Sequence, residues 1–165
     1  MNEILKITGL PILTGLIFLL IPENREKIRF IKGLLALAVC LVSGVFSFVL
    51  YYSGNKLVAL TDITPSLRLN FFGADLVDDI SRFASFNLDD LSKLIIIFIS
   101  LFALLLILYS LVRLNSEKIS NFFDYFLITL GASYGAVFSN NLLLFVIFWG
   151  ILAITLYKQI GRAHV

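Results

Sequence analysis

Two charged residues within apolar segments are the strongest candidates for chemistry in this chain. Lys32 lies near one end of an apolar segment, and Asp124 lies at the entrance of another. Ionisable groups inside a membrane are expensive to bury and often mark ion or proton paths. Each also has a simpler interpretation, Lys32 as a charge that extends into the headgroups and Asp124 as an acid that stabilises a helix N-terminus. We predict these simpler roles and keep both residues as ion-path candidates.

Other kinds of functional site find little support. The single cysteine, Cys40, excludes an internal disulfide and, in its apolar run, predicts a small buried residue. The sequence contains no metal-ligand cluster, phosphate loop, nucleophile motif or dinucleotide fingerprint. It therefore predicts no catalytic residue, no metal site and no cofactor held by this chain. Whether the chain belongs to an enzyme complex is left open.

The composition indicates an integral membrane protein. Hydrophobic residues make up 59% of the chain, charged residues 15%, and the mean hydropathy is +0.98. A soluble domain would be about half apolar and about a quarter charged. The formal net charge of +2 is too small to suggest a nucleic-acid partner. The lipid bilayer is the partner that this composition predicts.

Five apolar segments determine the expected architecture. A membrane-spanning helix needs roughly 20 mostly apolar residues. We predict an all-α integral membrane domain over residues 1–159, with helices at about 4–21, 30–52, 93–112, 122–138 and 141–157. The fourth segment carries small residues, which let neighbouring helices approach closely in lipid. They are Gly131, Ala132, Ser133, Gly135 and Ala136.

The long polar stretch 53–92 separates the second and third segments. Residues 66–72 alternate apolar and polar side chains, as a strand does, and 56–61 is a weaker partner for a β-hairpin. Residues 75–83 have the spacing of a short surface helix. Asp89 or Asp90 is expected to cap the third membrane helix, because a carboxylate accepts hydrogen bonds from free backbone N–H groups there.

The distribution of basic residues predicts the orientation. Membrane proteins keep Lys and Arg of short loops on the cytoplasmic side. The first connection, the third connection and the end of the fifth segment carry such residues, whereas the long loop counts less. We predict five crossings, an external N-terminus, an external long loop and a cytoplasmic C-terminal end. The residues are Arg25, Lys27, Arg29, Lys32, Arg113, Lys118 and Lys158.

The last six residues, IGRAHV, match a translated sequencing adapter, ATC GGA AGA GCA CAC GTC, followed by a stop codon. We expect residues 160–165 to be non-native and the natural polypeptide to continue beyond about Gln159. The only histidine, His164, then carries no function.

Three motifs in the same order resemble the antiporter-like membrane subunits of NADH:quinone oxidoreductases, Mrp cation antiporters and membrane-bound hydrogenases. They are LPILTGLIFLLIP near the start, FNLDDLS before the third segment, and NNLLLFVIFWGILAITLY in the fifth. The resemblance implies an N-terminal fragment of a multi-pass subunit in a bacterial-type inner membrane. It also implies other membrane subunits as partners, which carry out any electron transfer that drives proton or sodium translocation.

The resemblance also makes Gly150 a position of interest. The family carries a glutamate there, and the glycine that replaces it cannot bind a proton. Gly150 is thus a third ion-path candidate whose ionisable group is lost, and we expect it to permit close helix packing or a bend. Two alternatives stay open: a structural membrane scaffold that moves no ions, and an unrelated small integral membrane protein.

Overall fold

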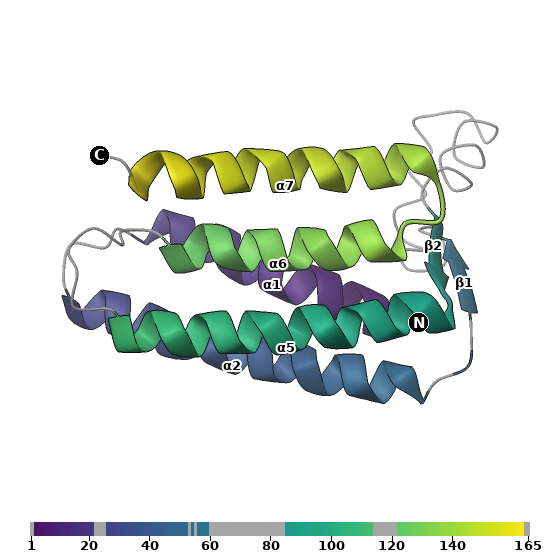
Figure 1. The fold of residues 1–165 in the computed structure, drawn as a ribbon, viewed down its shortest axis with the longest axis horizontal. Coiled ribbons are helices and arrows are strands. Elements are labelled where there is room, and N and C mark those ends of the chain that lie inside the picture. Colours follow the sequence, from purple (N-terminus) through teal and green to yellow (C-terminus); the bar gives the residue numbers. More distant parts are fainter. Residues whose placement is uncertain are drawn as a thin grey trace, which may run out of the picture.

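The computed structural model describes residues 2–21, 26–52, 54, 56–59, 85–113 and 122–163. Within these residues five helices lie side by side, and two short strands lie at one end of the bundle (Figure 1). The elements are α1 (Asn2–Leu20), α2 (Glu26–Tyr51), β1 (Lys56–Ala59), β2 (Ser85–Leu88), α5 (Asp90–Arg113), α6 (Phe122–Phe138) and α7 (Leu142–Ala163).

The helices differ from the sequence-based ranges mainly at their ends. α2 begins at Glu26 rather than at residue 30, and α5 begins at Asp90 rather than at residue 93. Polar residues at a helix end do not interrupt a helix, so hydropathy places the boundary too far inside. α7 continues to Ala163, past the predicted end at residue 157. The origin of residues 160–165 stays a prediction.

Three described helices are long and apolar enough to cross a membrane: Lys27–Tyr51, Asp90–Val112 and Leu142–Gln159. Two shorter apolar helices, Lys6–Leu20 and Phe122–Phe138, accompany them. The chain is thus an all-α multi-pass membrane protein. Its N-terminus lies at the end that carries the strands, and its C-terminus lies at the opposite end (Figure 1).

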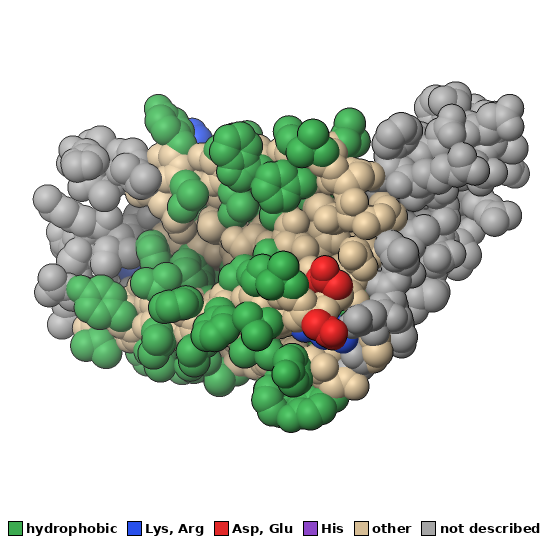
Figure 2. All heavy atoms as spheres, turned by 45° about the vertical axis from the view of Figure 1, so that its right-hand side comes forward, with side chains coloured by type: hydrophobic (Ala, Val, Ile, Leu, Met, Phe, Trp, Pro, Cys, Tyr) green, Lys and Arg blue, Asp and Glu red, His purple; other side chains and the backbone are tan. Residues whose placement is uncertain are grey.

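The bundle interior combines small and polar residues with large apolar ones, and large apolar residues also cover the outside. The buried face of α2 presents Lys32, Ala36, Cys40, Ser43, Ser47 and Leu50, at alternating spacings of three and four after residue 36. Large apolar side chains, including Leu101 and Phe102 of α5, are more than half exposed, and Figure 2 shows hydrophobic side chains spread along the helices. Lipid solvates such a surface, so close packing and polar contacts between the helices, and not burial of the outer side chains, hold the bundle together.

α6 is the central helix of the bundle. It packs against α1, α5 and α7, while α2 packs against α5 and α1. A Cβ atom on Gly131 would lie 2.7 Å from the Thr8 carbonyl oxygen of α1, and one on Gly135 would overlap the Phe148 ring of α7. The predicted close approach at the small residues of this helix is confirmed.

The two strands differ from the predicted hairpin. β1 pairs antiparallel with β2, with Lys56 opposite Leu88 and Ala59 opposite Ser85. The strand at 85–88 was not predicted, because its four residues fall in the polar lead-in to the next helix. The predicted strand at 66–72 and helix at 75–83 lie outside the described residues.

β2 also contacts the turn between α6 and α7. The Asn140 backbone N–H donates to the Ser85 carbonyl at 3.0 Å, and Phe86 forms a bridge with Ser139. The strand therefore links the start of α5 to the turn that joins α6 and α7.

Candidate functional site

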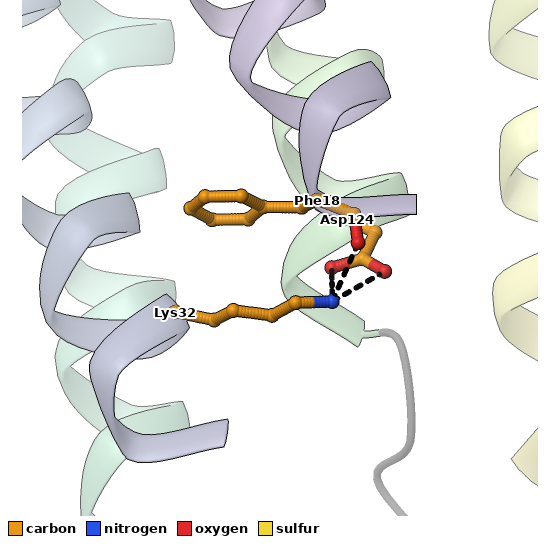
Figure 3. Close-up of polar contacts among 3 residues, drawn as sticks. All are labelled: Phe18, Lys32 and Asp124. Carbon is orange, nitrogen blue, oxygen red and sulfur yellow. Dashed lines mark hydrogen bonds and ion pairs between the residues drawn. The ribbon is translucent and has the colours of Figure 1, made fainter. Parts of the chain in front are cut away.

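Lys32 of α2 and Asp124 of α6 form an ion pair inside the bundle. The Lys32 Nζ atom lies 3.1 Å from both carboxylate oxygens of Asp124. It also donates a hydrogen bond to the backbone carbonyl of Phe18 in α1, at 2.7 Å (Figure 3). Lys32 is 2% exposed and Asp124 is 1% exposed. The two ion-path candidates, which come from two different helices, thus form one buried ion pair. Lys32 connects this pair to a third helix, α1.

The arrangement contradicts the headgroup interpretation of Lys32. Its side chain turns inward, because the carboxylate of Asp124 and the Phe18 carbonyl provide acceptors there. The Phe18 ring also lies 5.6 Å from the ammonium group, within the range of a cation–π interaction. Asp124 does lie in the first turn of α6, as expected for an acid that stabilises a helix N-terminus.

Two glycines let the three helices close around the pair. A Cβ atom on Gly15 of α1 would lie 2.7 Å from the Asp124 carbonyl oxygen, and one on Gly33 of α2 would lie 2.7 Å from Leu111 and 3.0 Å from Phe123. A larger residue at position 15 would push α1 away from the α6 backbone, and one at position 33 would require the Leu111 and Phe123 side chains to move. The pair thus lies beside a close approach between the backbones of α1 and α6.

Burial makes this ion pair energetically different from a surface pair. Breaking a buried pair by removing one partner costs about 3–5 kcal/mol, because the remaining charge stays in an apolar environment. Lys93 and Asp90 form the contrasting case, a 3.2 Å contact in which Lys93 is 3% exposed but Asp90 is 83% exposed, so water reaches the carboxylate. An exposed pair contributes about 0–1 kcal/mol.

A second polar group joins α2, α5 and α6 nearer the strand end. The Ser100 hydroxyl lies 2.9 Å from the Ser47 hydroxyl and 2.8 Å from that of Tyr134. Ser47 and Ser100 also lie within 2.8 Å of the carbonyl oxygens of Ser43 and Ile96, one turn earlier in their own helices. These are four contacts, but the three hydroxyl groups carry one hydrogen each. One contact therefore lacks a hydrogen at any instant.

Buried apolar residues separate the two polar groups. Asp124 and Tyr134 are ten residues apart on α6, which corresponds to ~15 Å along a helix. Leu127 and Leu130 lie between them and are buried. The hydroxyl of Ser43 is also buried and has no hydrogen-bond partner among the described residues. The Lys32–Asp124 pair and the Ser47–Ser100–Tyr134 group are thus separated from each other by apolar packing.

Gly150 takes no part in either group. A Cβ atom at this position would meet nothing within 4 Å among the described residues. The expected role in close helix packing is therefore wrong for this part of the chain. Within 142–159 of α7, Thr155 is the only buried residue, and its hydroxyl accepts a 2.9 Å hydrogen bond from Thr129 of α6. Gly150 lies on the outward side of α7.

The predicted cap of the third membrane helix is confirmed at Asp89. Its Oδ1 atom accepts a hydrogen bond from the Ser92 backbone N–H at 2.8 Å. Hydrogen bonds from the Ser92 side chain and backbone lower the pKa of the Asp89 carboxyl below its usual value. Asp90 lies one residue later, in the first turn of α5.

Sequence reasoning identified Lys32 and Asp124 but did not pair them, and it missed the Ser47–Ser100–Tyr134 cluster. A signal for the pair exists in the sequence. Both charges lie close to helix ends that the five-helix topology places on the same side of the bundle. Over the residues that the structure describes, no group of three or more His, Cys, Asp or Glu side chains gathers as metal ligands would.

Comparison with known proteins identifies similar membrane proteins. The chain is 31% identical over 142 residues to the A1 subunit of a Na⁺/H⁺ antiporter from Staphylococcus haemolyticus, covering 85% of this chain and 16% of that protein. It is 29% identical over 157 residues to the A/B subunit of a probable K⁺/H⁺ antiporter from Rhizobium meliloti, covering 93% and 14%. The A1 subunit of a Staphylococcus aureus Na⁺/H⁺ antiporter is 35% identical over 98 residues, covering 59% and 11%.

No protein-family model matches the chain. The chain spans about a sixth or less of the length of these relatives. The similarity nevertheless covers most of its own length, and it agrees with the apolar helices and the three motifs. The chain belongs to the antiporter-like membrane subunit family.

Proposed function

We propose that this chain forms part of the membrane domain of a cation/proton antiporter subunit. The observation that carries this proposal is the similarity to Na⁺/H⁺ and K⁺/H⁺ antiporter subunits over 85% and 93% of the chain. The apolar exterior of the helices and the polar side chains buried between them support it. The remaining membrane helices and other membrane subunits would then be its partners, in a bacterial-type inner membrane.

The proposed topology has the N-terminus and the β1–β2 end outside. Lys27 and Arg29 of α2 and Lys158 of α7 lie at the opposite end of the bundle, near the C-terminus. Basic residues next to membrane helices favour the cytoplasmic side. Accessibility of single cysteines placed at positions 54 and 158, in a Cys40→Ser background, would test this topology with a membrane-impermeant maleimide.

The names of the relatives indicate only the class of ions that would be transported. Both kinds of relative exchange a monovalent cation for H⁺, according to their names. Coupling to electron transfer in a respiratory complex is the finer alternative suggested by the sequence motifs. The relatives' names favour antiport over that alternative.

A structural scaffold is the second candidate function. It is favoured by Gly150, which provides no ionisable group on α7, and by the burial of both Lys32 and Asp124. In a scaffold the helices would hold partner subunits in place without contributing an ion path. The opposing hypothesis is that Lys32 and Asp124 themselves form part of an ion path.

The experiment uses the complete polypeptide with its partner subunits, expressed in a bacterial host that lacks its own antiporters. In inverted membrane vesicles, a proton gradient is established and Na⁺ or K⁺ is added while a pH-sensitive dye is followed. Antiport predicts cation-dependent loss of the gradient. Proton pumping that needs an electron donor and ignores added cations would replace antiport with the respiratory alternative. Absence of both activities in correctly assembled complexes would favour the structural scaffold as the function of this chain.

A further inference from the structure

The Lys32–Asp124 pair lies where two helices with opposite end charges meet. Phe18 is within the last four residues of α1, where carbonyl groups lack the usual hydrogen bond from the residue four positions later. Its carbonyl accepts from the Ile21 backbone N–H at 3.1 Å and from Lys32 at 2.7 Å. Asp124 is within the first turn of α6, where backbone N–H groups are free. A helix carries partial negative charge at its C-terminus and partial positive charge at its N-terminus. The positively charged Lys32 thus faces the negative end of α1, and the negatively charged Asp124 lies at the positive end of α6.

We infer that Lys32 and Asp124 form a directional clamp, which requires the cation on α2 and the anion on α6. The ammonium group binds the C-terminal end of α1 and the carboxylate at the same time, so it connects α1, α2 and α6. Exchange of the two charges would keep an ion pair but would place a cation at the α6 N-terminus and an anion beside the α1 carbonyl. Attraction between side chains alone would tolerate that exchange, whereas the clamp does not.

The surroundings of the pair support a structural role over an ion-carrying role. Among the described residues the ammonium group donates to three oxygen atoms, and both side chains are at most 2% exposed. Gly15 brings α1 against the Asp124 backbone with no space for an added methyl group, and Gly33 brings α2 against the Phe123 ring. A group that exchanges protons or cations during transport needs access to water. The clamp is independent of the proposed function, because it concerns how the helices assemble.

Cys40 provides a built-in reporter for this inference. It is the only cysteine in the chain, it is 1% exposed, and it lies on the buried face of α2 two turns after Lys32. A fluorogenic maleimide reacts with such a thiol only when the bundle opens, so the labelling rate of the detergent-solubilised chain measures opening. The rate is compared at one temperature below the melting temperature of the unmodified protein.

Four variants distinguish the possibilities. Lys32→Met and Asp124→Asn each leave one buried charge without its partner, and we expect labelling at least about tenfold faster than in the unmodified chain. The apolar double variant Lys32→Met/Asp124→Leu removes both charges, and we expect labelling within about threefold of the unmodified chain. The exchanged variant Lys32→Glu/Asp124→Lys should label as fast as the single variants. Asp90→Asn is the control, because it neutralises an acid that also pairs with a buried lysine, Lys93, but is itself 83% exposed and lies in the first turn of α5.

Slow labelling of the exchanged variant would overturn the directional clamp, since pairing alone would then suffice. Slow labelling of both single variants would also overturn it. In vesicles carrying the complete polypeptide, the apolar double variant should keep its cation-dependent proton flux. Loss of that flux with Cys40 still protected would show an ion-carrying pair and overturn the structural assignment. If the unmodified protein shows no flux, the proposed function fails, but the labelling results still decide the clamp.

Discussion

The hydroxyl oxygens of Ser100 in α5 and Tyr134 in α6 lie 2.8 Å apart in the interior of the bundle. Tyr134 is fully buried, and Ser100 is 6% exposed. A buried phenol must satisfy its hydroxyl group, and in an apolar interior this requirement selects one register between the two helices. The same serine continues the contact to Ser47 of α2, so one tyrosine orients three helices.

Replacing Tyr134 by Phe should lower stability without changing the fold. The variant removes one of the three hydroxyl hydrogens that serve the four contacts. Interhelical hydrogen bonds in membranes contribute about 0.6–2 kcal/mol, so we expect a loss in this range. The melting temperature can be followed by maleimide labelling of Cys40. Tyr109→Phe is the control, because Tyr109 is on the surface of α5 and 62% exposed. Equal melting temperatures for both variants would contradict an energetic role for the cluster.

Adding one methyl group should have opposite effects at two glycines. In Gly131→Ala the new Cβ atom would lie 2.7 Å from the Thr8 carbonyl oxygen and 3.1 Å from the Ile12 backbone nitrogen. The backbone of α1 must shift, and such overpacking costs about 1–3 kcal/mol. In Gly150→Ala the new atom meets nothing, and alanine favours a helix over glycine by about 1 kcal/mol. We therefore expect a lower melting temperature for the first variant and an unchanged or higher one for the second. The reverse order would refute the close α1–α6 packing.

Introducing a carboxylate at Gly150 tests whether this position faces an ion path in the complete protein. The described structure leaves space for the side chain, so Gly150→Glu should assemble normally in the complete polypeptide. An ionisable group in a membrane helix changes ion movement where it meets a hydrated path. We expect altered cation-dependent proton flux in inverted vesicles. Gly150→Gln, which has the same shape without the charge, is the control. Normal assembly with unchanged flux in both variants would exclude a path at this position.

The parts of the structure that could be predicted from the sequence are those with local causes. The apolar segments, the Asp89 cap and the small-residue face of α6 each depend on residues a few positions apart. The pairing of Lys32 with Asp124 depends on residues 92 positions apart, so each charge received a separate, one-sided interpretation. The same reason explains why β2 was not predicted, since residues 60–84 separate it from its partner β1 in the sequence. Gly150 shows a further limit, because a motif places a residue on a helix without fixing the side that it faces.

The Asp89 cap should make the stability of the chain depend on pH in a defined acidic range. Hydrogen bonds from Ser92 lower the pKa of this carboxyl in the folded state, while the unfolded value is about 3.9. A lowered folded pKa means that the charged form contributes stability above the unfolded pKa. This contribution is lost as the pH falls through the folded pKa.

We therefore expect Asp89→Ala to lower stability by about 1 kcal/mol at pH 7, with a smaller difference from the unmodified chain below about pH 4. Asp89→Asn should keep most of the stability at pH 7, because asparagine also accepts the capping hydrogen bond, and should show less pH dependence. Melting temperatures measured between pH 3 and pH 7 by a label-free method, such as light scattering, provide the comparison. A constant difference between the Ala variant and the unmodified chain over this range would assign the cap to hydrogen bonding without a contribution from the charge.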